Sequence, residues 1–339
     1  MTDNKRLTHI DVAKGLGIFL VVFGHALVFS GYVESLMFAT IYSFHMPFFF
    51  FISGYLYKRK DANSYFSSKI KTLLFPVLVY QSINLFLYFL TWCCGKTKLY
   101  KKISFGGFWF IITLLFIVVM HYVFDTIISN RITKPKMKIL VLIFISFVFL
   151  LTGLIYASSI SDQPNQPIAT AFVGLFFYEL GVILNCASNT PKKGYSTVTR
   201  IVAFVIGVSL LVVLYFTSKI NSVTVDMNTS RYGKVWIFVS QAIIEIAGLY
   251  LVSLGILKNK ILQYLGRNSL VILMIHIPIT KFTPYVVRNF EINKSITLLI
   301  CTSLSIGISL LAAWFFEKHI PILAGKYIWE KNDGKEQVS

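Results

Sequence analysis

Ten stretches of this chain are long and apolar enough to cross a lipid bilayer, and they constrain its fold more than any other feature. A membrane-spanning helix needs about 20 mostly apolar residues. We predict an all-α, polytopic membrane protein, a bundle of about ten transmembrane helices that forms a single integral-membrane domain over residues 1–339. The stretches lie at approximately 15–33, 36–57, 73–95, 106–124, 138–157, 168–186, 200–218, 234–256, 266–288 and 294–316.

The composition agrees with a lipid-embedded chain. Hydrophobic residues make up 56% of the sequence and charged residues only 14%, whereas soluble domains carry about 25% charged residues. This apolar content excludes an intrinsically disordered chain. The four cysteines are too few for a disulfide scaffold, and no Cys/His spacing indicates zinc. We therefore expect neither a disulfide framework nor a metal site.

The net charge of +18 is explained by the membrane rather than by nucleic acid. Lysine and arginine accumulate in the cytoplasmic loops of membrane proteins. Here they recur at every second connection, whereas 158–167 contains none and 96–102 is the exception. We predict that both termini are cytoplasmic and that nucleic acid is not a partner. The cationic segments are 5–14, 58–71, 131–138, 192–200, 258–267 and 318–335.

Ionisable side chains within the spans are the candidates for function. A charged group at the centre of a bilayer costs at least about 2.5 kcal/mol, so such residues are rare unless they serve a purpose. The candidates are Asp11 at the edge of the first span, Lys14, His25, His45, His121, Glu179, Glu245 and His276.

The first span places two of these candidates on one face. Lys14 and His25 are separated by 11 positions, which on a helix leaves them within about 20° of each other and about 16 Å apart. Lys14 would lie at the cytoplasmic edge and His25 in the far half of the bilayer. The alternative is a snorkelling lysine and a histidine that bonds a neighbouring helix for structural reasons.

The second span contains a proline next to its histidine. Pro47 lacks a backbone donor, so we expect it to kink or start a helix and to place His45 at an irregular turn. Non-helical backbone within a membrane is tolerated only against protein or a water-filled cavity. His45 is therefore expected to face a cavity rather than lipid.

These motifs resemble those of a known family. The segment from Asp11 to His25 resembles the opening of the acyltransferase-3 family of membrane O-acyltransferases, whose signature is a basic residue, ten residues and a histidine. The segment 44–54 is similar to the next motif of the fucose 4-O-acetylase-like branch, and 178–181 and 265–278 are similar to later landmarks.

The sequence departs from the family pattern at two positions. Lys14 stands where arginine is commoner, which loses a bidentate contact to phosphate but keeps the charge. Lys69, Lys71 and Thr72 precede Pro76 where the family often has a pair of arginines. The cofactor-binding position at this second site is therefore left open.

The resemblance implies a multi-pass protein of the bacterial inner membrane that transfers an acyl group, usually acetyl. The donor would be acyl-CoA, with no permanently bound cofactor. The acceptor would be a sugar hydroxyl of a surface polysaccharide or its lipid-linked precursor. A histidine can take the proton of such a hydroxyl, and His25 is the first choice for this base. His45 is the second, as its partner or as a donor to the developing oxyanion.

The other roles follow from the charges of the two substrates. The phosphates of coenzyme A require cations, for which Lys14, Arg59, Lys69 and Lys71 are candidates, or they are charges that only set the topology. Asp11, Glu179, Glu245 and His276 would bind substrate or orient a histidine. Alternatively, the two glutamates pair with lysines.

Three other interpretations are weaker. A transporter or flippase would use buried His and Glu residues, but it favours inverted repeats, which the sequence does not show. A glycosyltransferase would need a carboxylate base on a loop, for which Asp162 is the candidate. A covalent acyl-enzyme on Ser53 competes with a simple packing role for the Ser53–Gly54 pair.

Overall fold

The computed structural model describes residues 8–104, 108–160, 166–187, 196–221, 223–256, 259–287, 290 and 292–326. Within these ranges the chain is helical and contains no β-strand, apart from one isolated bridge between Asp226 and Arg231. Several residues of the predicted cationic loops, and Asp162, lie outside the described ranges.

Ten helices in the described part of the chain are long and apolar enough to cross a membrane, which confirms the predicted class and number. Nine are single helices: α1 (Thr8–Phe29), α2 (Leu36–Tyr55), α6 (Phe108–Arg131), α7 (Pro135–Ile160), α8 (Pro167–Ala187), α9 (Thr197–Thr217), α10 (Val235–Gly255), α12 (Ser269–Val287) and α13 (Lys294–His319). The tenth joins α3 (Ala62–Lys69), the π-helical turn η1 (Ile70–Leu74) and α4 (Phe75–Cys93). The shorter elements are α5 (Thr97–Ile103), η2 (Ser218–Asn221), η3 (Met227–Thr229), α11 (Lys260–Arg267) and η5 (Pro321–Ala324).

Two helices begin earlier than the hydropathy pattern predicts. α1 begins at Thr8 instead of residue 15, and the third span begins at Ala62 instead of residue 73. Hydropathy marks the part of a helix that lies in hydrocarbon, whereas backbone hydrogen bonding continues into polar turns. Asp11 and Lys14 therefore lie inside a regular helix.

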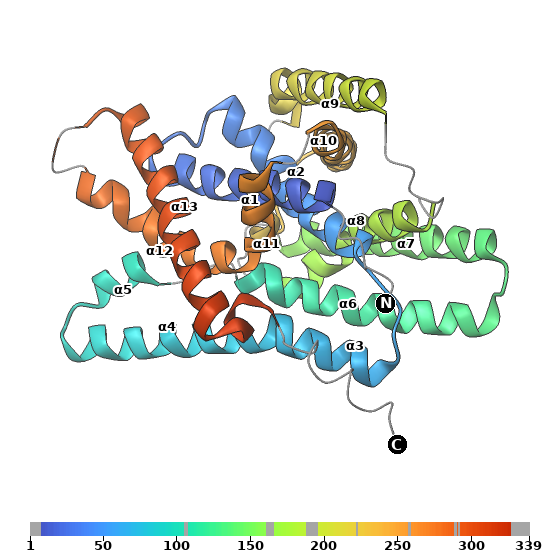
Figure 1. The fold of residues 1–339 in the computed structure, drawn as a ribbon, viewed down its shortest axis with the longest axis horizontal. Coiled ribbons are helices and arrows are strands. Elements are labelled where there is room, and N and C mark those ends of the chain that lie inside the picture. The colour runs from blue at the N-terminus through green and yellow to red at the C-terminus, as the bar shows by residue number, and fades with distance from the viewer. Residues whose placement is uncertain are drawn as a thin grey trace.

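Because consecutive spans run in opposite directions, the bundle has two distinct ends. We call the end where α1 begins and α2 finishes the proximal end, and the other the distal end. The connections α2–α3, α6–α7 and α8–α9 are proximal, and the connections α4–α6 and α9–α10 are distal (Figure 1). The predicted orientation would place the proximal end in the cytoplasm.

Helices α1, α2 and α8 form the centre of the bundle. α1 contacts α2, α10, α11, α12 and α13, and α2 packs closely on α8. A Cβ atom on Gly54 of α2 would overlap the carbonyl of Tyr178, and one on Gly181 of α8 would overlap the carbonyl of Phe51. The two backbones therefore touch, as small residues permit in membrane bundles.

The same crossing accounts for the Ser53–Gly54 pair. The Ser53 hydroxyl donates to the carbonyl of Phe49 on its own helix, at 2.7 Å. Gly54 lies in the α2–α8 contact. The pair therefore has a packing role, and the Ser53 hydroxyl is already engaged with the backbone.

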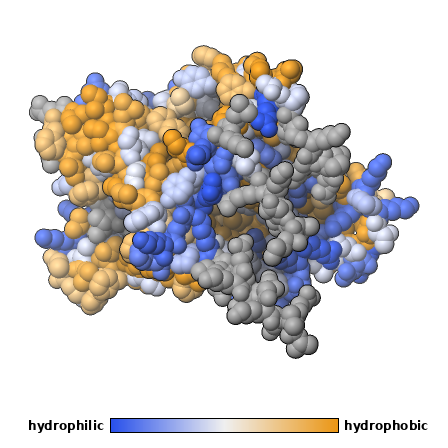
Figure 2. Space-filling model, viewed as in Figure 1, coloured by the Kyte–Doolittle hydropathy of each residue, from blue (hydrophilic) through white to orange (hydrophobic). Residues whose placement is uncertain are grey.

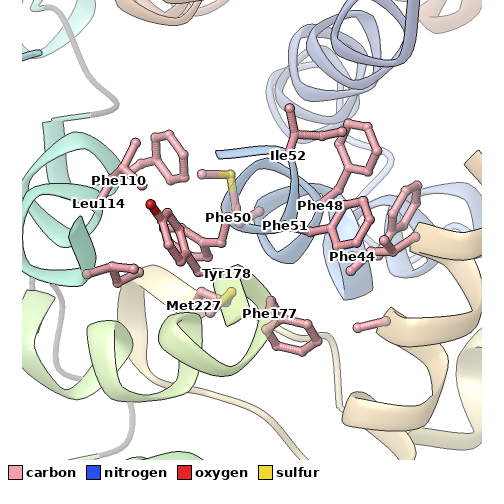
Figure 3. Packing of buried hydrophobic residues seen from close by; sticks show 14 of the residues in the cluster. Phe44, Phe48, Phe50, Phe51, Ile52, Phe110, Leu114, Phe177, Tyr178 and Met227 are labelled. Carbon is pink, nitrogen blue, oxygen red and sulfur yellow. The ribbon is translucent and has the colours of Figure 1, made fainter. Parts of the chain in front are cut away.

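Aromatic side chains fill the space around this crossing. Figure 3 shows Phe50 and Phe51 of α2 near the centre of this cluster, with Phe110 of α6 on one side, Phe44 and Phe48 of α2 on the other and Phe177 of α8 below, and all six are at most 6% exposed. The peripheral spans differ, because α4, α7 and α9 leave most of their apolar side chains at least partly exposed, as lipid-facing helices do. Figure 2 shows hydrophobic surface to the left of a hydrophilic band over α11 and the end of α13, and over α9 at the top.

No helix starts at Pro47, and the prediction of an irregular turn at His45 is wrong. α2 is helical from Leu36 to Tyr55 and passes through Pro47 without interruption. Only the one hydrogen bond that Pro47 cannot donate is lost, and neighbouring helices tolerate such a loss in membrane proteins. His45 therefore lies in a regular helix, although it still faces a cavity, as described below.

Pro76 does alter its helix. Pro76 has no N–H and cannot donate a hydrogen bond to the carbonyl of Thr72. In the preceding turn the Phe75 N–H donates to the carbonyl of Ile70, five residues back, and not to a carbonyl four residues back. This π-helical turn contains Lys71 and follows Lys69. Such turns are frequent at functional sites.

The native cysteines provide a test of orientation. Cys93 and Cys94 lie exposed at the distal end of α4, whereas Cys186 lies exposed at the end of α8, which is proximal. With a cytoplasmic proximal end, a membrane-impermeant maleimide should label the Cys186→Ser protein in intact cells. It should label the Cys93→Ser/Cys94→Ser protein only after permeabilisation. The opposite pattern would invert the topology.

Candidate functional site

Three of the predicted site histidines lie around one cavity of about 130 Å³. His25 comes from α1, His45 from α2 and His276 from α12, and the ring centroids of His25 and His276 are 5.2 Å apart. His45 is 5% exposed and His276 is fully buried, whereas His25 is half-buried. We call this cavity the histidine pocket. Its other lining residues are Val21, Tyr42, Met46, Trp109, Phe110, Asp226, Met227, Asn228 and Leu273.

The pocket lies toward the distal end of the bundle. α1 is continuous from Thr8 to Phe29, so at about 1.5 Å per residue His25 lies about 26 Å from its proximal start and about 6 Å from its distal end. The α9–α10 connection, which supplies Asp226, Met227 and Asn228, is also distal. The pocket is therefore separated from the proximal end by most of the length of α1.

Backbone carbonyls fix the protonation pattern of two of the histidines. His45 Nδ1 lies 2.7 Å from the carbonyl oxygen of Ile41, and His276 Nδ1 lies 2.8 Å from that of Ile272. A carbonyl oxygen only accepts, so each Nδ1 carries the hydrogen. In the neutral rings each Nε2 is then an acceptor with a free lone pair. His276 Nε2 is buried and finds no hydrogen-bond partner among the described residues.

This pattern corrects one expectation for His45. One predicted role of His45 was donation of a hydrogen bond to a developing oxyanion, but the only N–H of a neutral His45 already donates to the carbonyl of Ile41. It can offer a base or a hydrogen-bond acceptor to the pocket, not a donor.

His25 has a different partner. Its Nδ1 lies 3.4 Å from the hydroxyl of Tyr42, a residue on α2 that the sequence interpretation missed. A hydroxyl can donate or accept, so this contact leaves both neutral forms of His25 accessible. When Nδ1–H points to Tyr42, Nε2 is free to take a proton. His25 is thus the pocket histidine whose proton can move between its two nitrogens.

The distal loop adds polar groups that the sequence interpretation also missed. Asp226 and Asn228 belong to the α9–α10 connection and line the pocket beside the histidines. The sequence shows that this loop is polar. It does not show that the loop lies beside His25, because about 200 residues separate the loop from His25 and only the tertiary fold brings them together.

Glu179 orients a histidine, but not one of the pocket. Its Oε1 lies 2.7 Å from His121 Nδ1, with side-chain exposures of 2% and 0%. The rings of Tyr57 and Tyr178 pack against His121, with centroids 4.2 Å and 5.0 Å away. Neither His121 nor Glu179 lines the histidine pocket. The pair instead joins α6 to α8.

A second acidic residue lies close to this pair. Asp125 of α6 accepts a hydrogen bond from the Tyr57 hydroxyl at 3.0 Å and pairs with Lys138 at 2.5 Å and Arg59 at 3.6 Å. Burial, together with the adjacent Asp125 carboxylate, raises the pKa of Tyr57 above its usual range, so the hydroxyl keeps its proton. Arg59, a predicted phosphate ligand, thus already has a carboxylate partner.

Glu245 of α10 contacts a different helix. Its Oε2 accepts a hydrogen bond of 2.5 Å from the hydroxyl of Ser43 on α2, and Glu245 is 1% exposed. Ser43 is two positions before His45 on the same helix. Glu245 therefore stabilises the position of α2 beside the pocket and is not itself part of the lining.

The remaining predicted residues lie at the proximal half of the bundle. Asp11 pairs with Arg267 at 3.9 Å, which ties α1 to α11. Lys69 Nζ lies 5.4 Å from the ring centroid of Tyr65, and Lys71 is half-buried in η1, which packs against α6 and η5. Lys14 is half-buried on α1. The proximal end is thus rich in cations, unlike the pocket.

The buried pair of His121 and Glu179 should be a determinant of stability. Removing one partner of a buried pair costs about 3 kcal/mol or more, because the other is left unsatisfied. We expect Glu179→Ala to lower the free energy of unfolding in detergent by about this amount. Glu34→Ala, at an exposed position, should leave it unchanged, and His121→Phe/Glu179→Leu should recover part of the loss. Equal stability of the Glu179 and Glu34 variants would contradict the assignment.

The match to a known family covers all ten candidate membrane spans except the last residues of α13. A family model described as an acyltransferase domain, that of the acyltransferase-3 family, matches residues 7–316. No curated protein and no solved structure matches the chain. The matched region runs from the residue before α1 to near the end of α13, so it contains every residue of the histidine pocket. The chain therefore belongs to the acyltransferase-3 family and is a multi-pass membrane acyltransferase.

Proposed function

We propose that this protein is an O-acetyltransferase of the bacterial inner membrane. It would move an acetyl group from acetyl-CoA to a sugar hydroxyl of a surface polysaccharide or its lipid-linked precursor. The observation that carries the proposal is the histidine pocket, where three imidazoles meet beside polar groups of a loop. Family membership favours this activity over the transporter interpretation. Assignment of the chain to the fucose 4-O-acetylase-like branch stays a prediction.

In the proposed reaction His25 is the general base. Its Nε2 takes the proton of the acceptor hydroxyl while Nδ1–H points to Tyr42. The hydroxyl oxygen attacks the thioester carbonyl, a C–O bond forms, and the C–S bond breaks as the tetrahedral intermediate collapses. The thiolate of coenzyme A leaves, and the proton held by His25 neutralises it. The atoms of the two substrates balance without a further reactant.

The pocket contains donors for the negative charge that develops on the thioester oxygen. With neutral His45 excluded as a donor, the available groups are the Tyr42 hydroxyl and the Trp109 indole N–H, and both residues line the cavity. Donors held in a dry cavity contribute strongly to acyl transfer. His45 and His276 then act as acceptors that orient the sugar.

The two substrates would approach from opposite ends. Cations at the proximal end, including Lys14, suit the phosphates of coenzyme A, whereas the pocket is lined by the carboxylate of Asp226. Lys14 and His25 lie about 16 Å apart along α1, so an extended pantetheine arm has to bridge this distance. The acetyl group would be delivered at the distal side.

His25→Gln tests the chemistry. Glutamine keeps a hydrogen-bonding group of similar reach but cannot take up a proton at neutral pH. Acetyl transfer from radiolabelled acetyl-CoA to glycan should fall by about 10²–10⁴, the usual contribution of a general base. His319→Gln, an exposed histidine at the end of α13, should retain full activity.

Two further variants decide between the histidines if His25→Gln remains active. His45→Gln removes the second candidate base. His276→Asn keeps a donor for the Ile272 carbonyl but has no Nε2. Full activity in all three variants would refute a histidine mechanism and favour transport.

Lys14 provides a test of donor binding. Lys14→Ala should weaken acetyl-CoA binding by about tenfold or more, the effect of losing one charged contact to a phosphate. Lys14→Arg should retain most of the affinity, since phosphate accepts either cation. Lys98→Ala removes an exposed cation of α5 at the distal end and serves as control. Unchanged affinity in a well-folded Lys14→Ala protein would remove Lys14 from the site.

A further inference from the structure

The loop that lines one side of the histidine pocket has a defined conformation, which its own hydrogen bonds stabilise. Asp226 and Arg231 form a two-hydrogen-bond bridge, with N–H to O distances of 2.8 Å and 2.9 Å. The turn between them contains η3 and Ser230, whose φ of 55° lies in the left-handed region. A non-glycine residue adopts this conformation only where its surroundings hold it. We call residues 223–234 the distal loop.

Side chains of the helices hold the distal loop in place. The hydroxyl of Thr170 on α8 donates to the carbonyl of Met227 at 2.9 Å. Asn221 donates to the carbonyl of Tyr232 at 3.0 Å and accepts from the Lys234 N–H at 2.6 Å. The loop is therefore fixed to both α8 and the end of α9, and its pocket-facing residues have defined positions.

Two polar side chains of this loop face the pocket. Asp226 Oδ1 accepts a hydrogen bond from the backbone N–H of Asn228 at 3.0 Å, so the Asp226 side chain is held as the N-cap of η3. Asn228 Oδ1 is buried and has no hydrogen-bond partner within the described part of the chain. A buried polar atom without a partner is costly. A ligand that donates a hydrogen bond at this position would remove the cost.

The charge of the loop selects the kind of ligand. The carboxylate of Asp226 opposes an anion, which excludes the phosphates of coenzyme A from this wall of the pocket. Carboxylate and amide oxygens accept from hydroxyl groups, and the amide NH₂ of Asn228 donates to a hydroxyl oxygen. A neutral molecule with several hydroxyls therefore fits both residues.

The size of the cavity indicates how much of such a ligand enters. Its volume of about 130 Å³ holds about four water molecules at about 30 Å³ each. We infer that this space admits the reacting edge of one sugar ring together with the acetyl group, and that the rest of the acceptor extends beyond the cavity.

We propose that Asp226 and Asn228 form the acceptor subsite, binding two hydroxyls of a sugar so that a third points at His25. The proposal rests on the function proposed above and adds the residues that select the acceptor. Asp226 and Asn228 are binding residues and take no part in the proton transfer.

The test separates acceptor binding from catalysis. Saturation-transfer NMR on the detergent-solubilised protein measures binding of the methyl glycosides of fucose, galactose, glucose and mannose without acetyl-CoA. Acetyl transfer to the glycoside that binds best then gives the KM of acceptor and donor separately.

The variants are chosen to keep the loop intact. Asn228→Ala removes the unpartnered amide, and Asp226→Asn removes the charge but keeps an oxygen for the Asn228 N–H. Thr229→Ala is the matched control, because it removes a hydrogen bond within the loop at a residue that does not line the pocket.

We expect both subsite variants to weaken glycoside binding and to raise the acceptor KM by about tenfold, the order expected for one lost hydrogen bond. The KM for acetyl-CoA should change less than twofold, and Thr229→Ala should behave as wild type. A lowered kcat with unchanged acceptor KM, or an effect equal to that of Thr229→Ala, overturns the subsite.

The same measurements distinguish failure of the subsite from failure of the function. Glycoside binding that depends on Asp226 and Asn228, without acetyl transfer, supports the subsite and refutes the acetyltransferase. Acetyl transfer that is insensitive to both variants refutes the subsite alone. Absence of glycoside binding to the wild-type protein overturns the subsite whatever the donor does.

Discussion

Hydrocarbon offers no hydrogen-bond partners, so each polar side chain inside this bundle must find its partner within the protein. Most do: Glu179 bonds His121, Glu245 bonds Ser43, and His45 bonds the carbonyl of Ile41. Some buried polar atoms remain without a hydrogen-bond partner in the described ranges. Two of them, His276 Nε2 and Asn228 Oδ1, belong to residues of the same cavity, whereas others, such as His121 Nε2 and Glu179 Oε2, lie away from it. The two pocket atoms are therefore available to a ligand that enters the cavity.

The sequence predicted those features that depend on the residues of a single helix, with Pro47 as an exception. The spans follow from hydropathy, and Lys14 and His25 share a face because both lie on the uninterrupted α1. It failed where distant segments meet. Nothing local in Glu179 indicates that its partner is His121, 58 residues earlier. Pro47 shows that a local rule can also fail within one helix, since it predicted an irregular turn at His45 and α2 instead stays helical through Pro47.

The groups available to the two proposed substrates lie in different parts of the bundle. The proximal end combines Lys69 and Lys71 with a π-helical turn before Pro76. The histidine pocket is lined by Asp226 and Asn228, on a loop fixed by Thr170 and Asn221. Exposed cations such as Lys98 also lie at the distal end, so the net charge of the two ends does not by itself separate the substrates. In the proposed function it is the lining of the pocket that favours a neutral, hydroxyl-rich acceptor.

The protonation pattern of the pocket narrows its ligand further. The Nδ1–H groups of His45 and His276 donate to the carbonyls of Ile41 and Ile272. In their neutral forms these histidines can therefore only accept a hydrogen bond from a ligand. Asp226 also only accepts. The walls of the cavity therefore present more hydrogen-bond acceptors than donors, and a complementary ligand must contain hydrogen-bond donors. Each hydroxyl of a sugar is such a donor, whereas a phosphate or carboxylate has only acceptor oxygens and a negative charge. His25 differs from the other two histidines because its Nδ1 contacts the Tyr42 hydroxyl and not a backbone carbonyl, and this difference is why the proposed reaction uses it as the base.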